Sequence, residues 1–531
     1  MTDATRPLHS WREAFQSILH PRVISMLFLG FSAGIPILLI FSSLSLWLSE
    51  AGIKRSTVTF FSWAALSYSF KFLWSPLIDK IPVPWLTRKM GKRRSWILVT
   101  QLMICASIAL MATIDPSVPG NLGIMAFATI LLGFSAASQD IVIDAYRIES
   151  ASKELQTMMA SSYITGYRLG TVVAGAGALY LASWLGSEKH HYLYIAWRWT
   201  YFSMIFFMLI GIVTTLLIPE PEHTKSHEQP HTYQDYLRIL FVFIVTAGTF
   251  ITAYIQLLPY FADSINLKPF ISTIALISGI SADLLFSYFP IFIHFLLEVI
   301  HFLLSIFIAI FMGWLLIRLG AINRSMAREV WIDPVKDFFQ RYGVKSALIL
   351  LVLIGLYRIT DIVPGVISNV FYQDLGFSKN EIATAVKTIG VFISIVGGFL
   401  GGIFAMHYGV MRSLMLGAIL TAFTNLVFVW LAFAGHDIVV MYIAVTADNL
   451  AAGFASAAFI AFLSSLTNIS FTAVQYAIFS SLMTLLPKTI GGYSGTIVDN
   501  IDYSGFFIFT TLIGIPVIWL VWVARNHLSV K

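Results

Sequence analysis

The chain has 531 residues, of which 58% are hydrophobic and 11% are charged, and its mean hydropathy is +0.81. A soluble domain carries about 25% charged residues, so this composition excludes an ordinary soluble protein. Repeated apolar runs of about 20 residues predict an all-α polytopic membrane protein, because helices satisfy their own backbone hydrogen bonds in lipid. The net charge of +6 comes from basic residues in short loops, so nucleic-acid binding is not expected.

Six spans are predicted in an N-terminal half, residues 1–218. Residues 1–22 are polar and the first apolar run is too long for a signal peptide, so no cleaved leader is expected. The connection after the second span is rich in basic residues, which marks the cytoplasmic side. The predicted spans are 23–48, 57–78, 95–113, 121–146, 157–184 and 197–218, and the basic residues are Lys80, Arg88, Lys89, Lys92, Arg93 and Arg94.

Residues 219–345 are predicted to form a polar linker and an inserted transmembrane block. Basic residues flank both ends of the block, so it should cross the membrane an even number of times. We favour two full spans, 237–260 and 290–317, with 268–288 as a re-entrant or interfacial piece. Four short crossings are the alternative.

The C-terminal half, residues 346–531, is predicted to hold six more spans and ends in a basic tail. Both termini are therefore expected in the cytoplasm. Very short connections at 407–411 and 466–470 make the helices that they join antiparallel neighbours. The predicted spans are 346–372, 380–406, 412–434, 438–465, 471–497 and 501–524.

The fourth span ends in a stretch that is unusually polar for a membrane helix, Ser135 to Arg147. Asp140, Asp144 and Arg147 share one helical face, beside Gln139. Uncompensated charge in hydrocarbon costs at least about 2.5–3.5 kcal/mol per group, so this face should point into the bundle or a wet cavity. Asp140 and Asp144 are the candidate proton-coupling residues.

Further polar side chains lie within predicted spans of both halves. The cations among them exceed what a neutral sugar would need, which favours a cargo that carries carboxylates or phosphates. For each single residue, the alternative is a satisfied polar pair between helices. The predicted cargo-binding residues are Gln139, Tyr167, Arg168, Tyr357, Arg358, Asp361, Lys387, Asn449, Gln475 and Lys488.

Cysteine and histidine usage argues against metal chemistry. Cys105 is the only cysteine and lies in an apolar segment, so no disulfide framework exists within the chain. The 12 histidines form no spaced cluster with it, so we expect neither a metal site nor a cofactor.

Two six-helix halves, each with a basic loop after its second helix, resemble the layout of the major facilitator superfamily. Asp79 followed by Gly91-Lys-Arg-Arg94 is similar to that superfamily's loop motif, although the spacing is longer and Ser75 or Pro76 replaces the leading glycine. Asp79, Arg93 and Arg94 could form a cytoplasmic gate that joins the two half-bundles. Orientation charge alone is the alternative.

Several motifs resemble the AmpG family of muropeptide permeases. They are Phe31-Ser-Ala-Gly-Ile-Pro36, Lys71-Phe-Leu-Trp-Ser-Pro-Leu-Ile-Asp79, Ser135-Ala-Ala-Ser-Gln-Asp-Ile-Val-Ile-Asp-Ala145, Gly166-Tyr-Arg-Leu-Gly170, Leu356-Tyr-Arg358 with Asp361, and Lys387-Thr-Ile-Gly390. The resemblance implies proton-driven import of N-acetylglucosaminyl-1,6-anhydro-N-acetylmuramyl peptides across the inner membrane of Gram-negative bacteria. It also implies a role in peptidoglycan recycling and, in some species, in β-lactamase induction.

Three other functions compete with this one. A transporter of the same fold could carry acetyl-CoA or another anionic metabolite. A membrane-embedded transferase would use His407 or another histidine within the membrane, but no spacing of a nucleophile and a base supports it. A receptor or scaffold would show no flux at all. We expect a transporter rather than an enzyme, acting as a monomer in the lipid bilayer.

Overall fold

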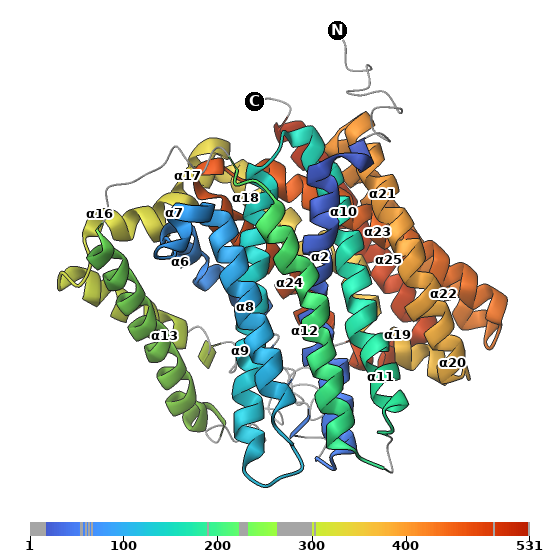
Figure 1. The fold of residues 1–531 in the computed structure, drawn as a ribbon. Helices are drawn as coiled ribbons and strands as arrows, with labels where there is room; N and C mark the ends of the chain where they lie inside the picture. Colours follow the sequence, from blue (N-terminus) through green and yellow to red (C-terminus); the bar gives the residue numbers. More distant parts are fainter. Residues whose placement is uncertain are drawn as a thin grey trace, which may run out of the picture. The chain divides into compact units, whose positions relative to one another are not determined.

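The structure, a computed structural model, describes residues 17–53, 57–58, 61, 64, 67–187, 191–221, 232–262, 300–301, 304–491 and 494–528. These residues form helices joined by short turns (Figure 1). The chain divides into two compact units, one made of Met1–Glu228 with Pro334–Lys531 and the other of Gln229–Asp333. Each unit is described by itself below.

The first half of the larger unit contains the helices that precede the linker. Its fifth membrane helix is continuous from α10 through η4, a short π-helical segment, to α11. The elements are η1 (Ser17–Leu19), α2 (Pro21–Ile40), α3 (Ser42–Glu50), α5 (Ser67–Phe70), η3 (Lys71–Leu73), α6 (Ser75–Lys80), α7 (Leu86–Met90), α8 (Lys92–Ala112), α9 (Asn121–Glu149), α10 (Lys153–Val172), η4 (Val173–Gly177), α11 (Ala178–Trp184) and α12 (Tyr194–Leu217).

The second half of this unit begins with a short helix, α17, that precedes the membrane helices. The elements are α17 (Asp333–Tyr342), α18 (Val344–Leu356), α19 (Ile359–Asp374), α20 (Lys379–Ile382), η7 (Ala383–Ile389), α21 (Gly390–Tyr408), α22 (Val410–Ala434), α23 (Ile438–Leu466), η8 (Ile469–Phe471), α24 (Thr472–Gly491) and α25 (Ser494–Leu528).

The smaller unit holds the long helix α13 (Tyr233–Ala262), an apolar helix over Leu304–Arg318, and the short segments α16 (Arg324–Ala327) and η6 (Arg328–Ile332). His301 Nε2 lies 2.9 Å from the carbonyl oxygen of Tyr254, and the two rings stack, which joins the helix pair. The predicted re-entrant piece, 268–288, lies outside the described residues.

Eleven helices in the described part of the chain are long and apolar enough to cross a membrane. One of them is Gln234–Leu257 in the smaller unit, and the others lie in the two halves. The predicted all-α polytopic fold is therefore confirmed. The second predicted span, 57–78, is described only in part, as α5, η3 and α6. The three-domain division proposed from the sequence stays a prediction.

Each half is built around its own apolar core. One cluster of buried side chains includes Trp47, Trp197 and Tyr201 of the first half. Another includes Phe371, Phe459 and many further residues, nearly all of the second half. Two separate cores allow each half to keep its packing while the contact between the halves changes.

Glycines bring pairs of helices into direct backbone contact. On α2, a Cβ at Gly34 would lie 2.1 Å from the carbonyl oxygen of Tyr167 on α10. In the second half, a Cβ at Gly397 of α21 would lie 2.2 Å from the carbonyl oxygen of Leu450 on α23. Such close approach is the usual way in which membrane helices pack without a hydrophobic driving force.

The two halves meet along a long seam. Helix α10 packs against α21 and α23, and α24 packs against α9, α6 and α5 (Figure 1). At one point of the seam, a Cβ at Gly402 of α21 would lie 3.1 Å from the Cβ of Ser161 on α10. This contact lies in the half of α10 that is nearer to its start at Lys153.

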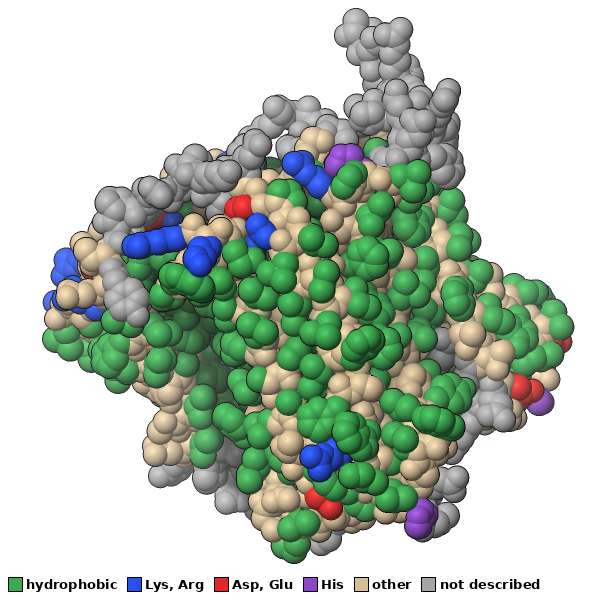
Figure 2. Space-filling view, viewed as in Figure 1, with side chains coloured by type: hydrophobic (Ala, Val, Ile, Leu, Met, Phe, Trp, Pro, Cys, Tyr) green, Lys and Arg blue, Asp and Glu red, His purple; other side chains and the backbone are tan. Residues whose placement is uncertain are grey.

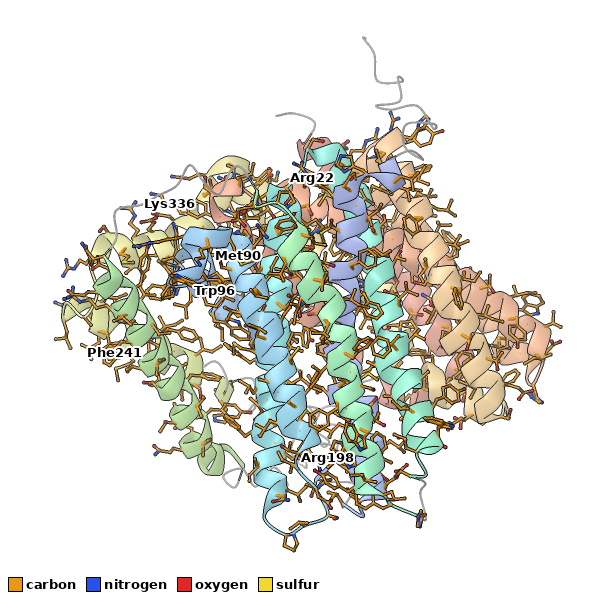
Figure 3. The ribbon with its side chains drawn as sticks, viewed as in Figure 1. Arg22, Met90, Trp96, Arg198, Phe241 and Lys336 are labelled. Atoms are coloured by element: carbon orange, nitrogen blue, oxygen red, sulfur yellow. The ribbon has the colours of Figure 1, made fainter. Side chains whose placement is uncertain are left out.

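Charge on the larger unit is distributed unevenly. Figure 3 locates the two ends of the helices: it shows Arg22, Met90, Trp96 and Lys336 toward one end and Arg198 toward the other. Most Lys and Arg side chains visible on this unit gather toward the first end, above a broad apolar belt (Figure 2). This is the end that the basic loop between α6 and α8 predicts to be cytoplasmic.

Candidate functional site

A pair of carboxylates is buried on α9. Asp140 and Asp144 are only 9% and 7% exposed, because α9 is surrounded by α2, α8, α10 and α24. The hydroxyl of Tyr163 on α10 donates a hydrogen bond of 3.1 Å to Asp140 Oδ1. Lys71 of η3 places Nζ 3.8 Å from Asp144 Oδ2. Both carboxylates thus have partners, which makes their burial tolerable.

Arg147, one turn beyond Asp144 on α9, is fully buried. Its Nη2 lies 3.4 Å from Asp144 Oδ1, and its Nη1 donates a hydrogen bond of 2.7 Å to Ser464 Oγ on α23. Its guanidinium also lies 5.2 Å from the ring centroid of Tyr476 on α24. Arg147 therefore joins the first half to two helices of the second half.

A second group of charges lies deeper along the seam. Arg358 stands between α18 and α19 and forms an ion pair with Asp361, with Nε 3.2 Å from Oδ2. Arg358 and Asp361 both lie close enough to Arg168 of α10 to interact with it electrostatically. Arg358 also acts on Lys488 of α24, and Asp361 acts on Asp448 of α23. Residues from four helices and both halves therefore share one electrostatic neighbourhood.

A tyrosine pair on α10 connects the two groups. The ring centroids of Tyr163 and Tyr167 lie 6.2 Å apart, and the hydroxyl of Tyr163 donates a hydrogen bond to Asp140. Tyr167 is within electrostatic range of both Asp140 and Arg168. On α10, Tyr163 and Tyr167 therefore lie between the acid pair and Arg168.

Helix α19, which follows Arg358, contains a proline. Pro364 has no amide hydrogen, so the carbonyl of Thr360, four residues earlier, loses its helical partner. The side-chain amide of Asn425 on α22 donates to this oxygen at 3.2 Å. The helix can therefore bend here without leaving a buried carbonyl unsatisfied.

Other predicted cargo-binding residues make contacts within the protein. Gln139 is fully buried, and its amide donates to Ser32 Oγ of α2 at 3.0 Å. The hydroxyl of Tyr357 donates to the carbonyl oxygen of Leu414, and Asn449 donates to the carbonyl oxygen of Val445.

Gln475 lies away from the acid pair, near α17, where its amide donates to the carbonyl oxygen of Pro334 and to Asp337. The side chain of Lys387 lies outside the described residues. Cargo contact by any of these residues stays a prediction.

The predicted gate residues form a network within the first half. Arg93 lies 2.7 Å from Asp79 and 2.6 Å from Glu149, and all three side chains are buried. Arg94 donates to the carbonyl oxygens of Thr215 and Leu216 at the end of α12. The hydrogen bonds of Arg93 and Arg94 therefore tie helices of one half together. Arg147, by contrast, forms a hydrogen bond across the seam.

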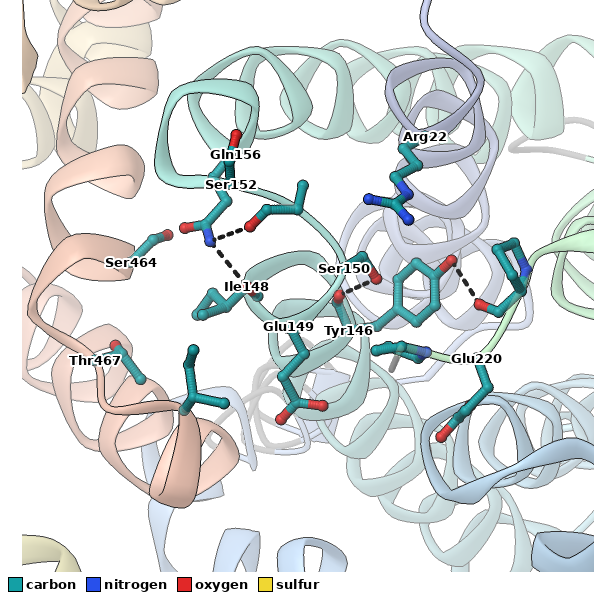
Figure 4. Close-up of a pocket in the computed structure, with 14 residues that line it drawn as sticks. Arg22, Tyr146, Ile148, Glu149, Ser150, Ser152, Gln156, Glu220, Ser464 and Thr467 are labelled. Carbon is teal, nitrogen blue, oxygen red and sulfur yellow. Dashed lines mark hydrogen bonds between the residues drawn. The ribbon is translucent and has the colours of Figure 1, made fainter. Parts of the chain in front are cut away.

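A cavity of about 350 Å³ opens beside this network (Figure 4). Its lining includes Glu149, Gln156 and Glu220 from the first half and Ser464 and Thr467 from the second. Burial raises the pKa of Glu220, although its two oxygens accept hydrogen bonds from the backbone amides of Arg93 and Arg94. In Figure 4 the cavity separates the turn after α9 from the end of α23.

In the described residues, no group of three or more His, Cys, Asp or Glu side chains could hold a metal ion. Sequence reasoning missed Lys71 and Tyr163 as partners of the acid pair, and Ser464 and Tyr476 as partners of Arg147. A lone lysine in an otherwise apolar second span was the one signal that could have indicated Lys71. The other three are hydroxyl residues that occur in many membrane helices.

Comparisons with known proteins agree with this architecture. A family model described as Major Facilitator Superfamily matches residues 80–330. The proton:xylose symporter XylE has a similar fold, with a TM-score of 0.56 and 11% identity, over 97% of this chain and 96% of that one. The human organic anion transporter MFSD10 is also similar, with a TM-score of 0.55 and 11% identity, over 94% and 99% of the two chains.

The sequence has relatives along almost its whole length. It is 29% identical to the putative transporter AmpG 4 of Rickettsia felis over 510 residues, 96% of this chain and 98% of that protein. It is 28% identical to the anhydromuropeptide permease of Escherichia coli K12 over 511 residues, 96% of this chain and 81% of that protein.

The fold, the spans and these relatives define a multi-pass membrane transporter, not an enzyme, with the fold of the major facilitator superfamily. Within that superfamily, the resemblance to AmpG-family permeases is confirmed by the relatives from Rickettsia felis and Escherichia coli.

Proposed function

We propose that this protein is a proton-coupled importer of anhydromuropeptides, which it brings into the cytoplasm for peptidoglycan recycling. The observation that carries the proposal is the buried acid pair, Asp140 and Asp144, on the seam between the two halves. Similarity to the anhydromuropeptide permease of Escherichia coli over nearly the whole chain supports the choice of cargo. The predicted location is the bacterial inner membrane, with both termini in the cytoplasm.

The charge of the seam supports an anionic cargo. Arg168, Arg358 and Lys488 outnumber Asp361 and Asp448 in the second group of charges. Stem peptides of the proposed cargo carry carboxylates, which guanidinium groups bind through paired hydrogen bonds. Arg168 and Arg358 are the proposed principal contacts, together with Lys387 and Lys488. A cargo carboxylate would compete with Asp361 for Arg358.

Asp140 is the proposed proton carrier, with Asp144 as its partner. A symporter moves cargo uphill only when the proton site is alternately loaded and emptied. Replacing Asp140 with Asn keeps the shape and the hydrogen bond from Tyr163 but prevents ionisation. This variant should therefore lose uphill uptake and retain exchange of labelled for unlabelled cargo.

The test is uptake of labelled anhydromuropeptide by membrane vesicles, with and without an imposed proton gradient. The matched control is Asp437→Asn, because Asp437 is an exposed helix cap whose oxygen the asparagine retains. Uphill uptake by Asp140→Asn at the wild-type rate would refute the proton-carrier role. Labelled acetyl-CoA in the same vesicles tests the alternative cargo, and its uptake in place of the muropeptide would overturn the proposed cargo.

A further inference from the structure

The acid pair and its cations form a neutral group when all are ionised. Asp140 and Asp144 supply two negative charges, and Lys71 and Arg147 supply two positive charges. The other titratable groups that face the pair are Tyr163 and Tyr167 of α10, Tyr68 of α5 and Tyr476 of α24. None of these four phenols is a cation.

Protonation of one carboxyl group would therefore leave an excess positive charge in a closed seam. The excess would act most strongly on Arg147, because this side chain is fully buried and its Nε already lacks a hydrogen-bond partner. A buried guanidinium that loses its carboxylate is costly, and hydration relieves that cost. Water is reachable nearby, since Ser464, the acceptor of Arg147, also lines the 350 Å³ cavity.

We propose that Arg147 couples protonation of Asp144 to opening of the seam between the two halves at this cavity. With Asp144 ionised, the carboxylate orients Arg147 toward Ser464 and Tyr476, and the seam stays closed. With Asp144 protonated, the closed contact holds an uncompensated cation and the open, hydrated arrangement is favoured. The proposal rests on the proposed function, because it assigns a consequence to the proton that Asp140 takes up and passes to its partner Asp144.

Whether the seam between the two halves is closed or open can be measured by cross-linking a pair of cysteines placed across it. A Cβ at Gly402 would lie 3.1 Å from the Cβ of Ser161 across the halves, and disulfides need about 3.5–4.5 Å. The pair Ser161→Cys and Gly402→Cys, in a Cys105→Ala background, should therefore cross-link when the seam is closed. Cross-linking rate in membranes at one fixed pH is the readout, so that thiol ionisation is the same in every variant.

A double-mutant cycle then tests the coupling. Asp144→Asn imitates the protonated carboxyl group and should slow cross-linking about tenfold when Arg147 is present. In the Arg147→Gln background the same change should alter the rate less than about twofold, because the cation that contacts Ser464 across the seam is gone. Arg147→Lys, which restores the charge, should recover most of the effect. An equal effect of Asp144→Asn with and without Arg147, or no effect in either background, would overturn the proposal.

Ser464→Ala provides a test that leaves α9 unchanged. It removes the acceptor of Arg147 and should slow cross-linking, whereas Ser465→Ala should not, because Ser465 donates only within its own helix to the carbonyl oxygen of Phe462. Equal rates for the two variants would contradict the role of Ser464.

The proposed function and the proposed role of Arg147 can be disproved separately. If muropeptide uptake is absent while the cycle shows coupling, the proposed cargo is wrong and the role of Arg147 stands. If proton-driven uptake is intact while the cycle shows no coupling, the proposed function stands and the role of Arg147 is wrong.

Discussion

Single side chains decide how charge is tolerated inside this membrane protein. Asp140 and Asp144 are compensated from three directions, by Lys71 of η3, by Tyr163 of α10 and by Arg147 of their own helix. Removing one member of such a buried group leaves its partner unpaired, which is usually costlier than the pair itself is stabilising. Variants that keep the charge should therefore differ sharply from variants that remove it.

Lys71 offers such a comparison. Lys71→Met leaves Asp144 with Arg147 as its remaining cation and should reduce proton-driven uptake by about tenfold or more, since buried charge pairs contribute several kcal/mol. Lys71→Arg keeps the charge and should retain most of the activity. Initial rates in vesicles, corrected for protein level, measure both. Wild-type uptake by the methionine variant would show that Lys71 has no part in coupling.

For individual residues, the sequence predicted the charged side chains of α9 but not the residues that they contact. The polarity of Ser135 to Arg147 within an apolar segment was sufficient to place a buried charged face on α9. The partners of that face could not be predicted, because a single sequence does not say which helix packs against which. Gln139 illustrates the same limit. It lies beside Asp140 in the sequence but points toward Ser32 of α2.

Helices in this protein pack through glycines that admit no side chain. Gly34→Ala would place a Cβ 2.1 Å from the carbonyl oxygen of Tyr167, on the helix that carries Arg168 and Tyr163. Overpacking of this kind costs about 1–3 kcal/mol, so the variant should unfold at a lower temperature in detergent. Gly123→Ala is the matched control, because a Cβ at this helical position of α9 meets nothing within 4 Å. Equal melting temperatures for the two variants would contradict this packing.

The positions of helices were largely predictable, and their interruptions were not. Span five was predicted as 157–184, and the continuous helix from α10 to α11 ends at Trp184. Span seven was predicted as one helix, whereas the structure divides it at Arg358 into α18 and α19. Hydropathy is averaged over a window of about 19 residues, so it does not detect a break as short as Tyr357–Arg358.

Across the whole molecule, the deeper part of the seam, where we propose that the cargo binds, holds more cations than carboxylates among the described residues. A muropeptide whose stem-peptide carboxylates are amidated keeps its sugars and most of its shape but loses the charge. It should therefore be taken up at least about tenfold more slowly than the native compound, because charge-assisted hydrogen bonds are about twice as strong as neutral ones. Competition between the two compounds in vesicles measures this. Equal uptake would contradict recognition through Arg168 and Arg358.

The proposed coupling of cargo transport to proton transport can be measured as proton movement that follows addition of cargo. The purified protein is reconstituted into liposomes that contain a pH-sensitive dye, with no initial gradient and with the membrane potential clamped. Addition of anhydromuropeptide outside should acidify the lumen with the wild-type protein and leave it unchanged with the Asp140→Asn, Asp144→Asn variant. Entry of labelled cargo into wild-type liposomes without acidification would contradict the account.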